Sequence, residues 1–279
     1  MSSSKIQKLK KYFKSKSNVL MAFLFGSQGE KRGSKTSDWD IACYFKPELS
    51  DIECETENYY PEESEIWGDL VKILETDNVD FIVLNRASAC LASSAIKGIQ
   101  LSMKDRKTYL EFMLRVTAEA EDYRQTAQEY AKVYWRSSSL SDEDRSLLNK
   151  RLLFLDSEFK DITFFENITR QEYETNRGRR RDLERWIENL INSSIDIAKT
   201  VLASEKQPIP SSYREILRVL SIMPDFPSDL CEQLAHWVEL RNILAHEYLD
   251  IRWKRIEKFL QNCEPFFSNF ITIVKERLE

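Results

Sequence analysis

The spacing of apolar residues changes once along the chain, and this change limits the folds open to it. Before residue 105, apolar residues gather in short runs separated by polar or glycine-containing turns, as in β-strands. After Asp105, which suits a helix N-cap, they recur every three or four positions, as in amphipathic helices. The short runs span residues 19–25, 39–45, 79–84 and 99–103. The sequence therefore predicts an α+β chain, with a mixed sheet and helices in front and an all-α bundle behind.

A polar break in the helical pattern indicates where the two domains divide. The stretch R-S-S-S-L-S-D-E-D at residues 136–144 interrupts a long helical pattern. We expect one domain over residues 1–135 that ends in the long helix, a linker at 136–145, and a helical bundle over 146–279. With 279 residues, the chain can give each domain a core of its own.

Composition excludes several classes of protein. The net charge of -5 gives no overall attraction to nucleic acid, so RNA contacts must use a local patch. The five cysteines contain no C-x-x-C pair, which favours reduced thiols in a cytoplasmic protein over disulfides or a zinc site. No segment approaches the length of a membrane span. The acidic stretch 48–65, which lacks Lys and Arg, is expected to be a solvated loop before a helix at 66–74.

A glycine-serine turn and two aspartates form the first candidate site. Gly26 and Ser27 follow the first apolar run, and Asp38 and Asp40 begin the second. In a strand, positions two apart point to the same face, so the two aspartates would stand side by side and repel each other. A divalent cation relieves that repulsion, and Mg²⁺ prefers carboxylate oxygens together with substrate phosphates.

A third carboxylate, Asp80, heads the next predicted strand and completes the set. Gly26 allows the backbone to approach a phosphate closely, and Ser27 can donate hydrogen bonds to it. These parts suit a phosphoryl or nucleotidyl transfer that uses two Mg²⁺ ions.

This order of residues resembles a known family. Residues 19 to about 103 are similar to the minimal nucleotidyltransferases of the DNA polymerase beta superfamily. The resemblance implies that Gly26 and Ser27 hold a nucleoside triphosphate and that the three aspartates bind Mg²⁺. Many relatives carry a glycine four residues after the serine, where this chain has Lys31.

The string R-N-I-L-A-H-E-Y at residues 241–248 forms the second candidate site. Arg241 and His246 are five positions apart, about 140° around an ideal helix, so they do not share a face. A second copy of the helix or long side chains must bring them together. The chemistry that fits is RNA cleavage by the ribose 2′-hydroxyl, in which His246 moves a proton and Arg241 stabilises charge on the phosphate.

The second string also resembles a known family. It is similar to the R-x-x-x-x-H-x-Y motif of the HEPN ribonuclease toxins, and the resemblance extends over residues 146–279. It includes N-S-S-I-D-I-A-K at 192–199 and P-S-S-Y-R-E-I-L at 210–217, and Asn242 fits the polar residue usual after the arginine. The family implies a homodimer in which two bundles place both motifs in one cleft.

The two resemblances together imply a regulated pair on one chain. In these toxin–antitoxin pairs the nucleotidyltransferase uses ATP to add AMP to the tyrosine of the motif, which blocks the nuclease. Tyr248 is then the expected acceptor, and the chain a fused toxin–antitoxin. The alternative is a small-molecule nucleotidyltransferase, such as an aminoglycoside-modifying enzyme, whose helical domain only binds substrate and dimerises.

Two further features favour structural roles. A basic cluster precedes the helix at residue 183, where a solvated helix start is favoured over an RNA contact. His236 lacks metal-ligand spacing to its neighbours and is expected to be a packed or surface histidine. The basic cluster consists of Arg177, Arg179, Arg180, Arg181 and Arg185.

Overall fold

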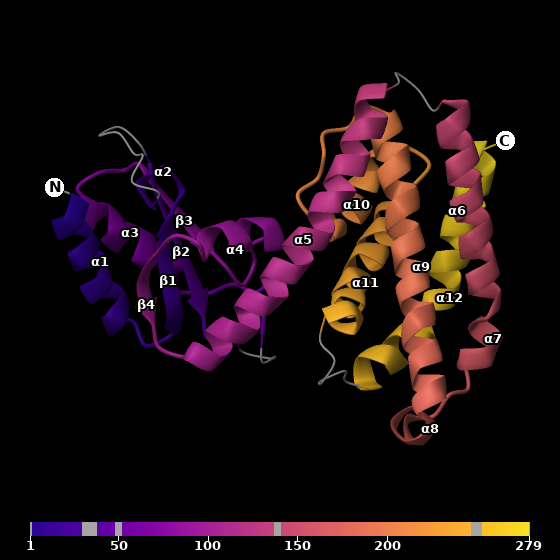
Figure 1. The fold of residues 1–279 in the computed structure, drawn as a ribbon, viewed down its shortest axis with the longest axis horizontal. Coiled ribbons are helices and arrows are strands. Elements are labelled where there is room, and N and C mark those ends of the chain that lie inside the picture. Colours follow the sequence, from indigo (N-terminus) through magenta and orange to yellow (C-terminus); the bar gives the residue numbers. More distant parts are fainter. Residues whose placement is uncertain (1, 30–37, 48–51, 137–140, 247–252, 279) are drawn as a thin grey trace. The chain divides into compact units, whose positions relative to one another are not determined.

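The computed structural model describes all residues except 1, 30–37, 48–51, 137–140, 247–252 and 279. The chain forms two compact units, Met1–Glu121 and Asp122–Glu279 (Figure 1). The first unit contains a sheet and helices, whereas all the regular elements described in the second unit are helices. The predicted α+β arrangement is confirmed.

A four-stranded mixed sheet forms the centre of the first unit. The strand order is β3-β2-β1-β4, with β1 antiparallel to both neighbours and β2 parallel to β3. Each strand falls on one of the apolar runs expected from the sequence. The strands are β1 (Val19–Phe25), β2 (Trp39–Phe45), β3 (Val79–Val83) and β4 (Ile99–Met103).

Helices cover both faces of this sheet, because alternate residues of the strands point to opposite sides. Leu24 of β1 packs with α1 (Ser2–Ser15) and α3 (Glu63–Leu74) on one face. Phe23 packs with α4 (Ala89–Ala95) and the start of α5 (Arg106–Arg136) on the other. Figure 1 shows the two pairs of helices on opposite sides of the strands.

The acidic stretch is only partly the solvated loop that the sequence predicts. Glu53 is 3% exposed, and its carboxylate accepts hydrogen bonds from the Tyr60 hydroxyl and, at 2.8 Å, from Asn85 Nδ2. Asn85 Oδ1 accepts a hydrogen bond from the Phe45 N–H at 2.8 Å, and Asn85 Nδ2 donates one to the Phe45 carbonyl at 3.1 Å. A buried carboxylate is tolerated only when donors satisfy it. Glu53 therefore ties the loop to the end of β2.

The second unit is built around one long, largely buried helix, α9 (Arg177–Ser204). Its neighbours α6, α10 and α11 pack against it, and Trp237 of α11 stacks on Phe267 of α12 at a ring-centroid distance of 5.3 Å. The other elements of this unit are α6 (Asp142–Lys160), α7 (Ile162–Phe165), α8 (Arg170–Thr175), α10 (Tyr213–Val219), a 3₁₀ turn (Leu220–Ile222), α11 (Ser228–His246) and α12 (Trp253–Leu278).

Helix α5 contributes residues to both units. The units divide between Glu121 and Asp122, inside this helix and before the linker expected at 136–145. In the second unit, Tyr123 donates a hydrogen bond to the Pro210 carbonyl, and Tyr130 donates one to the Gln207 carbonyl at 2.8 Å. The linker itself stays a prediction, since 137–140 lie outside the described residues.

All five cysteines are free, in agreement with the expectation of reduced thiols. Among the described helices, none combines the length and the apolar character needed to cross a membrane.

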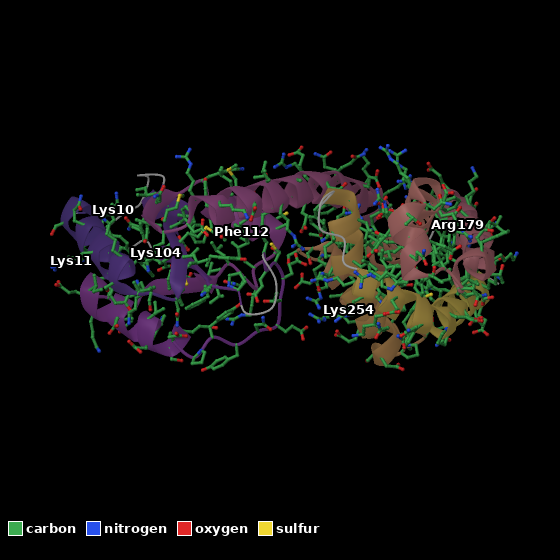
Figure 2. All side chains as sticks on the ribbon, turned by 90° about the horizontal axis from the view of Figure 1, so that it is seen from below. Lys10, Lys11, Lys104, Phe112, Arg179 and Lys254 are labelled. Atoms are coloured by element: carbon green, nitrogen blue, oxygen red, sulfur yellow. The ribbon has the colours of Figure 1, made fainter. Side chains whose placement is uncertain are left out.

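Replacing Phe112 by alanine is expected to destabilise the first unit by about 3–5 kcal/mol, because it empties a fully buried aromatic position. Phe112 (labelled in Figure 2) is 0% exposed, and its ring lies 4.6 Å from that of Tyr44. Leu114 of the same helix is 64% exposed, so Leu114→Ala is the control and should change stability by less than about 0.5 kcal/mol. Urea unfolding followed by circular dichroism measures both; equal shifts would contradict this packing.

Candidate functional site

Three aspartates lie at one edge of the sheet. Asp40 in β2 and Asp80 in β3 are register partners, and Asp38 directly precedes β2. Side chains of register partners on paired strands point to the same face. Asp38 and Asp80 are exposed, whereas Asp40 is half-buried opposite Phe25, the last residue of β1. The strand pairing thus places Asp40 beside Asp80, and Asp38 comes two residues before Asp40.

The aspartates repel one another. The pKa of Asp40 is raised, first by partial burial of its carboxyl, then by the charge of Asp80 and that of Asp38. Within the described residues, no group of three or more His, Cys, Asp or Glu is already gathered closely enough to hold a metal ion. The donor chemistry and the mutual repulsion nevertheless fit Mg²⁺, which prefers carboxylate oxygens and substrate phosphates to a complete protein cage.

The residue that follows β1, beside Asp40, must be a glycine. This residue, Gly26, has a φ of 62°, which is left-handed and favours glycine, and it begins the short helix α2 (Gly26–Gly29). A Cβ atom at this position would lie 2.0 Å from Oδ2 of Asp40. The backbone here approaches the aspartate closely, and Ser27 follows directly in α2. The following segment, which includes Lys31, lies outside the described residues.

The Arg241 guanidinium, on α11, contacts side chains of three other helices. Its Nε donates to Asn192 Oδ1 of α9 at 2.7 Å, and one terminal nitrogen lies 2.8 Å from Asp122 Oδ2 of α5. The other terminal nitrogen donates to Asn242 Oδ1 at 3.3 Å. The guanidinium carbon sits 4.9 Å from the centre of the Tyr213 ring of α10. The cation is 8% exposed and therefore needs these partners.

Tyr213 is itself fixed by its surroundings. Its hydroxyl lies 3.1 Å from Thr126 Oγ1, and its ring contacts Tyr123 edge to face at 5.3 Å. Burial raises the pKa of Tyr213 to about 12, so the phenol is neutral at physiological pH. It offers Arg241 an aromatic face, an arrangement in which guanidinium and ring attract each other.

The structure places only part of the second motif. Arg241 and Asn242 are buried in α11, and His246 is its last residue. The His246 side chain and all of Tyr248 lie outside what is described, so their approach to Arg241 stays a prediction.

Sequence reasoning missed three partners of Arg241, namely Asp122, Asn192 and Tyr213. Asn192 and Tyr213 belong to the segments 192–199 and 210–217, which carry the HEPN resemblance, but no spacing rule connects them to Arg241. Asp122 gave no signal beyond being a charged residue on a long amphipathic helix.

The basic cluster before residue 183 is mostly paired within the protein. Arg179 (labelled in Figure 2) donates to the Phe164 carbonyl at 2.9 Å and lies 3.4 Å from a carboxylate oxygen of Glu172. Arg185 pairs with Glu188 at 3.1 Å. These contacts favour the structural reading over an RNA contact.

Family models match both parts of the chain. Residues 7–107 match the family "Polymerase beta, Nucleotidyltransferase", and residues 155–274 match "Ribonuclease HepT-like". The chain joins a nucleotidyltransferase domain to a HepT-like HEPN domain. The aspartate edge lies in the matched part of the nucleotidyltransferase domain, and Arg241 lies in that of the HepT-like domain.

Two solved structures are similar to parts of the chain. One is a tri-AMPylated Shewanella oneidensis HEPN toxin in complex with MNT antitoxin, with 19% identity over 46% of this chain and 96% of that chain, and a TM-score of 0.42. The other is a toxin–antitoxin with AMP-PNP, with 21% identity over 47% and 97% of the chains and a TM-score of 0.36. No curated protein gives a match.

Replacing Asp40 by asparagine is expected to stabilise the protein at about pH 7, because it removes a charge that partial burial and the neighbouring aspartates both disfavour. Since the pKa of Asp40 is raised in the fold, its ionisation favours the unfolded chain as the pH rises. In EDTA, Asp40→Asn should melt about 1–3 °C above the wild type. The difference in melting temperature should vanish near pH 3, where the Asp40 carboxyl is protonated in both the folded and the unfolded protein. Mg²⁺ should raise the melting temperature of the wild type only.

Replacing Gly26 by alanine is expected to weaken binding of a nucleoside triphosphate about tenfold or more, because the new methyl group displaces Asp40. Gly68→Ala is the matched control, since a Cβ atom there meets nothing within 4 Å. Calorimetric titration with a non-hydrolysable ATP analogue measures both. Unchanged affinity in Gly26→Ala would rule out the proposed phosphate approach at this turn.

Proposed function

We propose that this chain is a fused toxin–antitoxin whose nucleotidyltransferase domain transfers AMP from ATP to Tyr248 of its HepT-like domain. The modification silences an RNA-cleaving activity that depends on Arg241 and His246. One observation carries the proposal: both matched domains stand on the same chain, each with its motif. The resemblance of the two motifs to paired toxins and antitoxins supplies the link between them.

The transfer step follows from the residues at the sheet edge. The phenol of Tyr248 loses its proton to solvent as its oxygen attacks the α-phosphorus of ATP. An oxygen–phosphorus bond forms, and pyrophosphate leaves with the electrons of the broken bond. Gly26 and Ser27 hold the triphosphate through the backbone and the hydroxyl. Asp38, Asp40 and Asp80 would hold two Mg²⁺ ions, which neutralise charge on the triphosphate when bound.

The ribonuclease step follows from the α11 motif. His246 takes the proton of a ribose 2′-hydroxyl, whose oxygen then attacks the adjacent phosphorus. The bond from this phosphorus to the 5′-oxygen of the next nucleotide breaks, and that oxygen leaves with the bonding electrons and takes a proton from water. Arg241 stabilises the negative charge that builds up on the phosphate oxygens. Asn242, which accepts a hydrogen bond from Arg241, supports the orientation of the guanidinium.

Adenylylation of Tyr248 would block this step in two ways. It brings a negative phosphate to within two residues of His246, where it can pair with Arg241 in place of RNA. It also adds the bulk of adenosine at the site. RNA binding is thereby opposed by both charge and volume.

We further propose that the HepT-like domains act as a homodimer. Arg241 and His246 are about 140° apart around an ideal helix, so one copy of α11 does not present both to one phosphate. A second copy of the motif supplies the missing partner.

The small-molecule alternative explains less of the chain. A drug-modifying nucleotidyltransferase has no use for a buried arginine held by two amides, a carboxylate and an aromatic ring. The HepT-like match over residues 155–274 also covers this motif.

Intact mass spectrometry tests the transfer. Wild-type protein produced in cells should carry one or more adenylyl groups on the peptide that contains Tyr248, whereas Asp38→Asn/Asp40→Asn should carry none. Asp77→Asn, an exposed aspartate outside the trio, is the control and should be modified like the wild type. The unmodified double variant should cleave RNA and inhibit growth, and adding Arg241→Ala or His246→Ala should abolish both effects.

Two results would contradict this function. One is the same unmodified mass for the wild type and the double variant, with no RNA cleavage by either. The other is adenylyl transfer to an aminoglycoside by a protein whose Tyr248 peptide stays unmodified, which would favour the small-molecule alternative.

A further inference from the structure

Arg241 is already paired with a carboxylate of its own chain. Each of its three guanidinium nitrogens has an oxygen partner, from Asn192, Asn242 and Asp122. Of these three partners, only Asp122 carries a charge. An arginine proposed to bind RNA phosphate thus holds an anion in the absence of RNA.

Asp122 is also more open to solvent than the arginine it pairs with. Its side chain is 36% exposed, against 10% for Arg241, while Asn242 is 7% exposed as a residue. The Tyr213 ring lies over one face of the guanidinium at 4.9 Å. Of the two partners of the terminal guanidinium nitrogens, Asp122 is therefore the more accessible to solvent.

We propose that Asp122 is an internal counter-ion that competes with RNA phosphate for Arg241, an inference that rests on the proposed ribonuclease function. A carboxylate and a phosphodiester are both anions, and a guanidinium binds each through the same N–H donors. A phosphate that pairs with the guanidinium edge beside Asp122 must take the place of this carboxylate. The pairing therefore weakens RNA binding whether or not Tyr248 is modified.

An asparagine at residue 122 keeps an oxygen that can accept a hydrogen bond from Arg241, so a purely positional role for Asp122 would survive Asp122→Asn. Asn192 and Asn242 already orient the guanidinium through neutral oxygens, and Tyr213 supports one of its faces. Removal of the Asp122 charge should therefore leave Arg241 in place and remove the competing anion. If Asp122 served only to position Arg241, the same change would leave RNA binding as in the parent.

The test uses the full chain with Asp38→Asn/Asp40→Asn as the parent, so that Tyr248 is unmodified. The binding probe is a fluorescent single-stranded RNA with 2′-O-methyl riboses, which cannot be cleaved through the 2′-oxygen. Adding Asp122→Asn should tighten its binding about two- to fivefold, the range expected for a partly exposed ion pair. It should also steepen the salt dependence by about one phosphate contact. With cleavable RNA, KM should fall while kcat is unchanged.

Glu129→Gln is the matched control. Glu129 lies on the same helix two turns further on and pairs with Lys199 at 2.5 Å instead of Arg241. Its replacement removes the same charge, so a general electrostatic effect would appear in both variants. Asp122→Glu, which keeps the charge, should behave like the parent.

The outcomes separate the two proposals. RNA binding by Asp122→Asn that equals or falls below that of the parent, or an equal gain in Glu129→Gln, overturns the competition alone. Cleavage by Arg241→Ala at the rate of the parent overturns the ribonuclease function itself. No RNA binding by either the parent or Asp122→Asn overturns both.

Discussion

Both cores depend on helix α5, because this one helix supplies side chains to each of them. Phe112 and Val116 are buried against the sheet in the first unit, whereas Tyr123 and Tyr130 are buried and hydrogen-bonded in the second. Helix formation is cooperative, so the folding of one half of a continuous helix favours the folding of its other half, which an unstructured linker would not do. The residue that pairs with Arg241 also comes from this helix. The same element therefore contributes to the fold of both units and to the charge balance of the second site.

The two sites differ in whether their charges are already balanced within the protein. At the sheet edge, Asp38, Asp40 and Asp80 lie near one another, and the raised pKa of Asp40 reflects first its partial burial and then their repulsion. A bound cation lowers the cost of that repulsion, so this site gains from its ligand. At Arg241, two amides and a carboxylate already satisfy the guanidinium. On the proposed ribonuclease function, RNA must displace an existing partner there, so this site resists its ligand. For the fused toxin–antitoxin proposed above, this difference favours a silent nuclease.

The sequence predicted the elements better than the contacts between distant residues. The strands were predictable because each is a short apolar run between polar turns, and the aspartate edge followed from the alternation of side chains along β2. Glu53 was missed because an acidic stretch without Lys or Arg suggests solvent, while Tyr60 and Asn85, two of the donors that hold it, are neutral and no spacing pattern links them to it. The partners of Arg241 were missed because Asp122 and Asn192 lie far from it in sequence and meet it only through the packing of helices.

The order of the domains along the chain determines which of them is synthesised first. The nucleotidyltransferase domain is N-terminal, so during synthesis it emerges and can fold before the HepT-like domain is complete. The contact between Asp122 and Arg241 forms as soon as the second unit folds, and it requires neither ATP nor Mg²⁺. The proposed adenylylation of Tyr248 requires both. The ion pair would therefore restrain the new nuclease during the interval before the covalent modification, which then makes the silencing lasting.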